Sequence, residues 1–393
     1  MRDFKVEKPS HISDFATEFN FEDLRPYYDT EVEPVMQKMV QDPTYFSLMK
    51  YLWPEMSESE AKEKALNTKK VRDFQAGYMS HAIWHIIKES SKGLTWSGIE
   101  KLDKNKAYLF VANHRDILLD SAILQIILEK EGFSTSEITF GSNLMDNGFI
   151  THFGRLNRMF TVKREGNAKE LYDISRQLSA YIRHTIIDKN VSVWIAQRNG
   201  RTKDGNDLTQ TGLLKMLGLS GGKDFVKCFS NLNIVPLSIS YEYEPCDYLK
   251  VQELYLSSLH SKYIKAPGED LNSIITGIKQ PKGKIHLAFG KVIQEELPEI
   301  NKAGNDNEKI KQLTALIDKQ IHNDFQLNPV NYVAYDLSFQ TNVFKNNYTS
   351  EEKTNFEKYV TEKTSSLSGE QEVLKAMFYK MYAYPVSNKL SKT

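Results

Sequence analysis

The sequence predicts an α/β protein: a largely parallel mixed sheet flanked by helices, with helical extensions at both ends. Two observations predict this class. Short apolar runs suited to buried strands alternate with helical patterns in the middle of the chain, and helical patterns without strands precede and follow them. The predicted division is a helical N-terminal region over 1–95, an α/β domain over 96–300 and a helical C-terminal extension over 301–393.

The composition is that of a folded protein with no net charge. Of the 393 residues, 40% are hydrophobic and 26% charged, which allows a sizeable core. The 51 basic and 51 acidic residues give a net charge of zero, so we expect no nucleic-acid partner. Any anion site must then come from a local cluster of basic residues. With two cysteines, no signal-peptide pattern and no apolar run near the ~18 residues of a membrane span, we expect a cytoplasmic protein, soluble or bound to a membrane surface.

Both ends of the chain carry helical signals. In "EVEPVMQKMV" and "VRDFQAGYMSHAIWHIIKES", apolar residues recur at three- and four-residue spacing, and "NEKIKQLTALIDKQIHNDF" opens a second helical region that ends in a polar tail. His81, His85 and Glu89 share one helix face, a spacing that could bind Zn²⁺. No further ligand accompanies them, so we interpret this segment as an amphipathic helix and expect no metal.

Six apolar runs between residues 96 and 300 predict the strands of the sheet. The clearest helix among them covers 168–188, where Leu171, Ile174, Leu178 and Ile182 lie on one face. Strands that alternate with helices favour a parallel arrangement. The predicted strands cover 106–113, 137–142, 158–164, 191–197, 233–243 and 283–290.

The stretch "VANHRDILLDSAIL" (111–124) places polar residues directly after a candidate central strand. Asn113 and His114 stand at its carboxyl end, where open α/β sheets place their sites, and carboxylates follow within one helical turn of the loop. A histidine oriented by a carboxylate is a general base for a hydroxyl. Since no Ser or Cys nucleophile is evident, the base would act on the acceptor directly. The alternative is a turn histidine at a helix start.

Two other motifs give weaker indications. His114, Arg115 and Asp116 resemble a kinase catalytic loop, but Ser121 stands where that loop needs Asn, and no D-F-G or glycine-rich phosphate loop accompanies it. "GLSGG" (218–222) fits a nucleophile pattern that requires a strand-to-helix turn. Here a helical pattern precedes it, which predicts a helix C-cap instead.

Basic residues gather after two of the predicted strands. One cluster contains Arg155, Arg158, Lys163 and Arg164, and the other contains Arg198, Arg201 and Lys203 in a glycine-containing loop. Arginine binds phosphate through two parallel hydrogen bonds, and glycine allows backbone N–H groups close to an anion. Beside a histidine site, the two clusters predict a local anion pocket; the alternative is a pair of solvated loops.

Four blocks resemble those of the glycerolipid acyltransferases, the superfamily of 1-acylglycerol-3-phosphate and glycerol-3-phosphate acyltransferases. "ANHRDILLD" resembles their N-H-x4-D box. "GRLNRMFTVKR" (154–164), "WIAQRNGRTKDG" (194–205) and "NIVPLSISYEY" (233–243) resemble the second, third and fourth blocks, in the family's order. The resemblance covers residues 96–295 and implies the acyltransferase fold.

The resemblance implies roles for particular residues. His114 would be the base and Asp120 its orienting carboxylate, although five residues separate them, Leu119 occupies the usual Asp position, and Asp116 is an alternative. Arg198 or Asn199 stands where the third block of the family has Glu. The candidate substrate-binding residues are Asn113, Arg115, Arg158, Lys163, Arg164, Arg198, Asn199, Gly200 and Arg201.

The implied activity is O-acyl transfer in phospholipid biosynthesis, from acyl-CoA or acyl carrier protein to a lysophospholipid or glycerol phosphate. It needs no metal or organic cofactor, and backbone N–H groups near the box would stabilise the oxyanion. The alternatives are a phosphate-free lysolipid acceptor and a catalytically silent lipid- or carrier-binding protein. Because the acceptor must leave a bilayer, we expect peripheral association with the inner face of the membrane, through an exposed apolar patch within 143–154. The patch residues would be Leu144, Met145, Phe149, Ile150 and Phe153.

Overall fold

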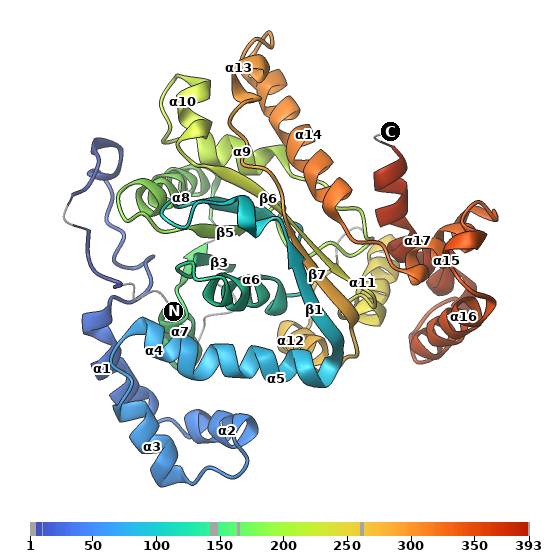
Figure 1. The fold of residues 1–393 in the computed structure, drawn as a ribbon, viewed down its shortest axis with the longest axis horizontal. Coiled ribbons are helices and arrows are strands. Elements are labelled where there is room, and N and C mark those ends of the chain that lie inside the picture. The colour runs from blue at the N-terminus through green and yellow to red at the C-terminus, as the bar shows by residue number, and fades with distance from the viewer. Residues whose placement is uncertain (1–4, 10, 142–147, 163–165, 260–262, 392–393) are drawn as a thin grey trace.

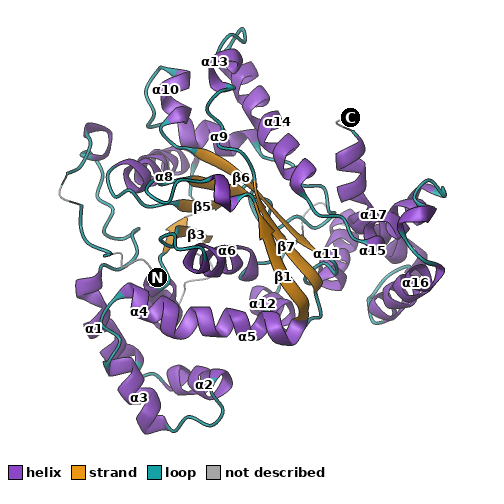
Figure 2. Ribbon diagram, in the orientation of Figure 1, coloured by secondary structure: helices purple, strands orange, loops and turns teal. Residues whose placement is uncertain are grey.

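A computed structural model describes residues 5–9, 11–141, 148–162, 166–259 and 263–391, with a seven-stranded sheet at its centre (Figures 1 and 2). The strand order is β1-β7-β6-β2-β5-β3-β4, and only the β6–β7 pair is antiparallel. The predicted largely parallel mixed sheet is therefore confirmed. The strands are β1 (Ser91–Ser97), β2 (Leu109–Ala112), β3 (Glu137–Gly141), β4 (Met159–Val162), β5 (Val193–Ala196), β6 (Ile234–Tyr241) and β7 (Gly283–Phe289).

Six of these strands coincide with the predicted apolar runs, and β1 is the exception. Its sequence, SKGLTWS, is mostly polar, and it begins inside the region predicted to be helical. The strand lies at an edge of the sheet, and only Leu94 and Trp96 pack against the core. An edge strand needs few apolar residues, so an apolar run was the wrong signal for it.

Helices cover both faces of the sheet and form two cores with it (Figure 1). The helix that follows His114, α6, is apolar on most sides because it lies between the sheet and α5. On that face lie α5 (His81–Ser90), α6 (Leu119–Lys130) and α12 (Glu269–Lys279). On the other face lie α8 (Ala168–Ile187), α9 (Thr211–Gly218), α10 (Phe225–Ser230), α13 (Leu297–Ile300) and α14 (Asp306–Asp324).

Two further helical clusters flank the α/β core. Although α14 lies beyond residue 300, it packs on the sheet rather than in the C-terminal cluster. No described helix is long and apolar enough to cross a membrane. The N-terminal cluster contains α1 (Asp29–Met39), α2 (Pro43–Leu52), α3 (Glu58–Leu66), α4 (Val71–Phe74), the π-helical turn Gln75–Ser80 and part of α7 (Gly148–Leu156). The C-terminal cluster contains α11 (Asp247–Leu259), α15 (Pro329–Phe339), α16 (Ser350–Ser365) and α17 (Gln371–Leu390).

The structure contradicts the predicted apolar patch on 143–154 at two of its five residues. Phe149 and Phe153 pack against the N-terminal cluster, and the ring centroid of Phe153 lies 5.3 Å from that of Phe74. Ile150 is 41% exposed. Leu144 and Met145 lie outside the described residues. The apolar spacing in this segment therefore serves packing of α7 on the N-terminal helices.

The end of β6 determines where the loop after β2 begins. The two strands pair from Leu109–Ile234 to Ala112–Leu237, so β6 continues past the end of β2. Asn113 bridges this overhang. Its side-chain oxygen accepts the N–H of Ile239 at 2.8 Å, and its amide donates to the Ile239 carbonyl at 2.9 Å. The side chain replaces a strand partner and fixes the backbone directly before His114.

Candidate active site

The candidate site lies in the loop between the central strand β2 and helix α6. Asp116 starts the helix, because its Oδ1 accepts the backbone N–H groups of Leu118 at 2.9 Å and Leu119 at 2.8 Å. A carboxylate in this position satisfies amide groups that a helix leaves unpaired at its first turn. The loop therefore has a fixed conformation at both ends, with His114 between them.

His114 and Asp120 form a hydrogen-bonded pair. Nδ1 of His114 lies 2.8 Å from Oδ2 of Asp120, which also accepts the N–H groups of Arg115 at 2.5 Å and Asp116 at 2.9 Å. Since an ionised carboxylate only accepts, the proton lies on Nδ1, and Nε2 is left with a free lone pair. Nε2 has no hydrogen-bond partner in the part of the chain that the structure describes. This is the arrangement of a general base.

Asp116 does not contact the imidazole. It is 1% exposed; Oδ1 caps α6, and Oδ2 has no partner among the described residues. Burial, and then the neighbouring Asp120 carboxylate, raise the pKa of Asp116. Of the two predicted carboxylates, Asp120 is thus the one placed to orient His114.

Arg115 lies beneath the loop rather than in the pocket. Its buried guanidinium forms ion pairs with Asp207 and Glu244, the latter at 3.0 Å. Lys250 donates to the Arg115 carbonyl at 2.6 Å and also binds Glu244. The prediction that Arg115 contacts substrate is therefore not supported: it is placed to support the loop from below. Asn113 is fully buried against β6 and likewise does not line the pocket.

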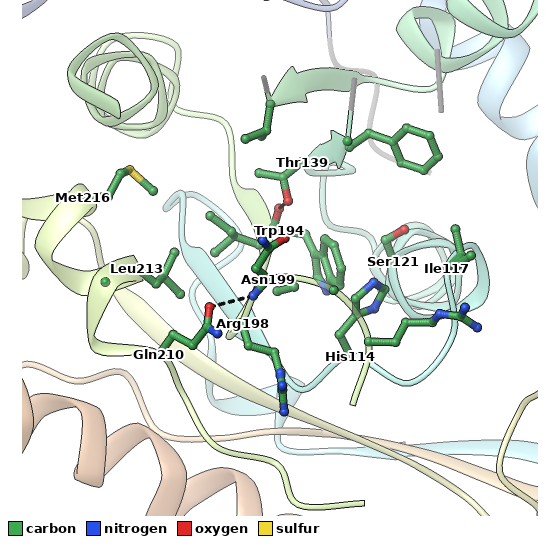
Figure 3. A pocket seen from close by; sticks show the side chains of 18 of the residues that line it. His114, Ile117, Ser121, Thr139, Trp194, Arg198, Asn199, Gln210, Leu213 and Met216 are labelled. Atoms are coloured by element: carbon green, nitrogen blue, oxygen red, sulfur yellow. Dashed lines mark hydrogen bonds between the residues drawn. The ribbon is translucent and has the colours of Figure 1, made fainter. Parts of the chain in front are cut away.

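A cavity of about 620 Å³ opens beside His114. Figure 3 shows His114 at one side of it, Leu213 and Met216 at the other, and Trp194 between them. The rings of Trp194 and His114 meet edge to face with centroids 5.6 Å apart. The apolar lining comes from strands β3, β4 and β5 and from helices α8 and α9: Phe140, Val162, Leu178, Trp194, Ile195, Leu213 and Met216. A pocket with a reactive polar end and an apolar end suits a substrate with a hydrocarbon chain.

The loop after β5 supplies the basic part of the lining, as predicted for one of the two basic clusters. Arg198, Asn199, Gly200 and Arg201 all border the cavity. Arg201 is 8% exposed, and its Nη1 is buried with no partner among the described residues. The Nε of Arg198 is also buried without a partner among them. A buried guanidinium nitrogen without a hydrogen-bond partner is costly, so these atoms indicate a site for an anion. Lys203, by contrast, is paired with Glu253.

The two described residues of the other basic cluster, Arg155 and Arg158, do not line the pocket. Arg158 is 1% exposed and donates to the carbonyl of Thr135 at 2.5 Å, so its prediction as a substrate-binding residue is not supported. Arg155 donates to the carbonyl of Arg25 at 2.9 Å and so joins α7 to the N-terminal segment. Lys163 and Arg164 lie outside the described residues.

The rival motifs have structural explanations. Helix α9 precedes "GLSGG", as predicted, and the hydroxyl of Ser220 lies 2.9 Å from that of Ser179. His81 stacks on Trp53 with ring centroids 4.5 Å apart. Within the described ranges, no group of three or more His, Cys, Asp or Glu residues could hold a metal ion.

A comparison with protein-family models finds a match to the segment that contains this loop. Residues 93–240 match the family model described as Acyltransferase, and this segment contains His114, Asp120 and the loop after β5. The match supports the resemblance of this segment to the acyltransferases. No curated protein matches the chain.

Among solved structures, the chain is similar to the 1-acyl-sn-glycerophosphate (LPA) acyltransferase PlsC from Thermotoga maritima. The two share 12% sequence identity with a TM-score of 0.38, over 75% of this chain and 95% of the other. A likeness this remote supports no conclusion about the substrate.

The structure also brings residues to the candidate site that the sequence analysis did not name. Trp194 forms a wall beside His114, and the Tyr241 hydroxyl donates to Oδ1 of Asp120 at 2.8 Å. Both lie in strands whose apolar character was the only property considered. A signal for Tyr241 did exist, since it is the polar end of the alternating series Val235, Leu237 and Ile239 on one face of β6.

Proposed function

We propose that this acyltransferase transfers a fatty acyl group from acyl-CoA or acyl carrier protein to the hydroxyl of a lysophospholipid or glycerol phosphate. One observation carries the proposal. His114, which is held by Asp120, and Arg201, whose Nη1 has no partner among the described residues, border one cavity, whose far side is apolar. A base, an anion site and a hydrocarbon site are what an acyl acceptor with a phosphate group requires.

The proposed reaction is direct transfer. Nε2 of His114 takes the proton of the acceptor hydroxyl while its oxygen attacks the thioester carbonyl, and Asp120 stabilises the imidazolium that forms. Collapse of the tetrahedral intermediate breaks the C–S bond, and the imidazolium returns the proton to the thiolate. Backbone N–H groups of the loop would stabilise the oxyanion. The thioester supplies the driving force, so the proposed reaction uses neither a metal nor an organic cofactor.

His114→Ala tests the proposal. The histidine lies at the pocket surface and fills no core, so the variant should fold with a normal melting temperature. General-base assistance accounts for about 10²–10⁴-fold of the rate, and thiol release from acyl-CoA or acyl carrier protein in the presence of acceptor should fall accordingly. Activity within a factor of a few of wild type would disprove the mechanism. A wild-type protein that binds the lipids but releases no thiol would favour the silent binding protein.

Arg201→Lys tests the acceptor. Lysine keeps the charge but loses the planar pair of donors, and a charge-assisted hydrogen bond is worth ~1.5–3 kcal/mol. The KM for a phosphate-bearing acceptor should rise roughly tenfold to a hundredfold, with the donor KM unchanged. Lys223→Arg, at a position outside the pocket lining, is the matched control. An unchanged acceptor KM would favour the phosphate-free lysolipid instead.

We further propose that the enzyme works at the inner face of the membrane, from which it takes its lipid acceptor. The apolar side of the cavity supports this, because a lysophospholipid whose acyl chain enters it must leave a bilayer. Sedimentation with phospholipid vesicles, with and without acceptor lipid, would test the association.

A further inference from the structure

Tyr241 makes the only side-chain hydrogen bond to Oδ1 of Asp120 that the described residues provide. The other oxygen, Oδ2, carries the contacts to His114 Nδ1 and to two backbone N–H groups. The carboxylate is thus fixed at both oxygens, so that it can neither rotate about its own axis nor turn away from the imidazole. We propose that Tyr241 is a positioning residue for acyl transfer, which acts through Asp120.

The fold places the phenol there for a simple reason. Tyr241 is the last residue of β6 and lies on the overhang that passes beneath the loop after β2. The antiparallel neighbour β7 supports this overhang, because Tyr241 pairs with Ile285. The hydroxyl therefore reaches Asp120 from a rigid strand rather than from a loop.

The phenol is in the correct protonation state to donate. It is 2% exposed, and burial together with the Asp120 carboxylate raises the pKa of Tyr241 well above its usual value. The phenol therefore stays protonated over the working range of the enzyme, and its single proton points to the carboxylate. A buried phenol without this acceptor would carry an unsatisfied donor.

The sequence spacing explains why this site needs such a contact. Five residues separate His114 from Asp120, one more than in the family box that it resembles. The longer loop has more backbone freedom, and it is fixed by contacts from outside it: Thr202 donates to the His114 carbonyl at 2.7 Å, and Lys250 to that of Arg115 at 2.6 Å. Tyr241 provides the equivalent constraint for the carboxylate.

Tyr241→Phe removes the hydroxyl alone and is the direct test; it rests on the proposed role of His114. Loss of a hydrogen bond to a charged group corresponds to roughly a tenfold to hundredfold fall in kcat. Tyr241 does not line the pocket, so both KM values should stay within about twofold of wild type. A tenfold to hundredfold rise in KM with a normal kcat would overturn the proposal.

Tyr181→Phe is the matched control. Tyr181 is 1% exposed and donates to the buried carboxylate of Glu137 at 2.5 Å. Glu137 is the first residue of β3, so the bond lies at the opposite end of the parallel sheet from His114. Both variants should lose comparable stability, but only Tyr241→Phe should lose kcat. Equal kcat in the two variants would show that the Tyr241 bond is structural only.

A double-variant comparison separates positioning from general damage. If Tyr241 acts through Asp120, Tyr241→Phe should cost little further rate in an Asp120→Asn enzyme. A full, additive loss would contradict the inference. Activity that survives His114→Ala would instead refute the proposed function, whereas an inactive His114→Ala with a normal Tyr241→Phe refutes this inference alone.

Discussion

Replacement of Asp120 by Asn should reduce the rate while leaving the site geometry intact. The amide can place its oxygen at the Oδ2 position, where it accepts from His114 and from the N–H groups of Arg115 and Asp116. Its nitrogen then faces the Tyr241 oxygen, which can accept. The opposite orientation would set the amide nitrogen against three donors, so it is disfavoured.

The magnitude follows from that geometry. Because the tautomer of His114 is kept, the variant loses only the negative charge that stabilises the imidazolium. A hydrogen bond to a charged partner is worth ~1.5–3 kcal/mol, which corresponds to roughly a tenfold to hundredfold fall in kcat. Both KM values should stay near wild type, since Asp120 is buried and does not line the pocket.

The control is the same substitution four residues earlier. In Asp116→Asn the side-chain oxygen still caps α6, and the atom that changes is the one without a partner. Its kcat should stay within about threefold of wild type. Steady-state thiol release with saturating acceptor measures both variants. If Asp116→Asn loses more rate than Asp120→Asn, or if both lose equally, the assignment of Asp120 is refuted.

Three further outcomes are expected. Burial raises the pKa of Asp116 above its value in the unfolded chain, so the folded protein loses stability as the pH rises from the unfolded pKa through the folded one. In urea unfolding, Asp116→Asn should therefore be more stable than wild type at about pH 7 but not at about pH 3. Arg115→Leu leaves the buried carboxylate of Asp207 without its cation and Glu244 with Lys250 alone, and should cost ~3–5 kcal/mol of unfolding free energy. Met216→Trp fills the apolar side of the cavity and should lower kcat/KM for long-chain donors more than for short ones.

Much of the fold was predictable because buried strands leave a strong signal. Each of the strands β2 to β7 carries an apolar run, and the alternation with helices predicts the parallel arrangement. The position of His114 was predictable for a related reason, since the carboxyl end of a central strand is where an open sheet exposes polar groups. The order of apolar and polar residues along the sequence thus indicates both which strands are buried and how they are connected.

The partners of individual polar residues were not predictable in the same way. Arg115 and Arg201 are equivalent in sequence terms, because both follow a strand beside a candidate site. The structure gives Arg115 two buried carboxylates, Asp207 and Glu244, and leaves the Nη1 of Arg201 unpaired. Those carboxylates lie about 90 and 130 residues away in sequence. Only the tertiary fold decides which cation is satisfied internally and which remains for a ligand.

The contacts of Glu244 and Lys250 connect the C-terminal helices with the catalytic loop. The Tyr382 hydroxyl on α17 accepts the N–H of Glu244 at 2.8 Å, and the Glu244 carboxylate binds both Arg115 and Lys250. Lys250 in turn donates to the carbonyl of Arg115, the residue directly after His114. Since each of these groups is buried, a shift of α17 would leave a charge or a backbone group unpaired beneath the loop. The C-terminal cluster is therefore part of what fixes the base, although none of its helices α15, α16 and α17 lines the pocket.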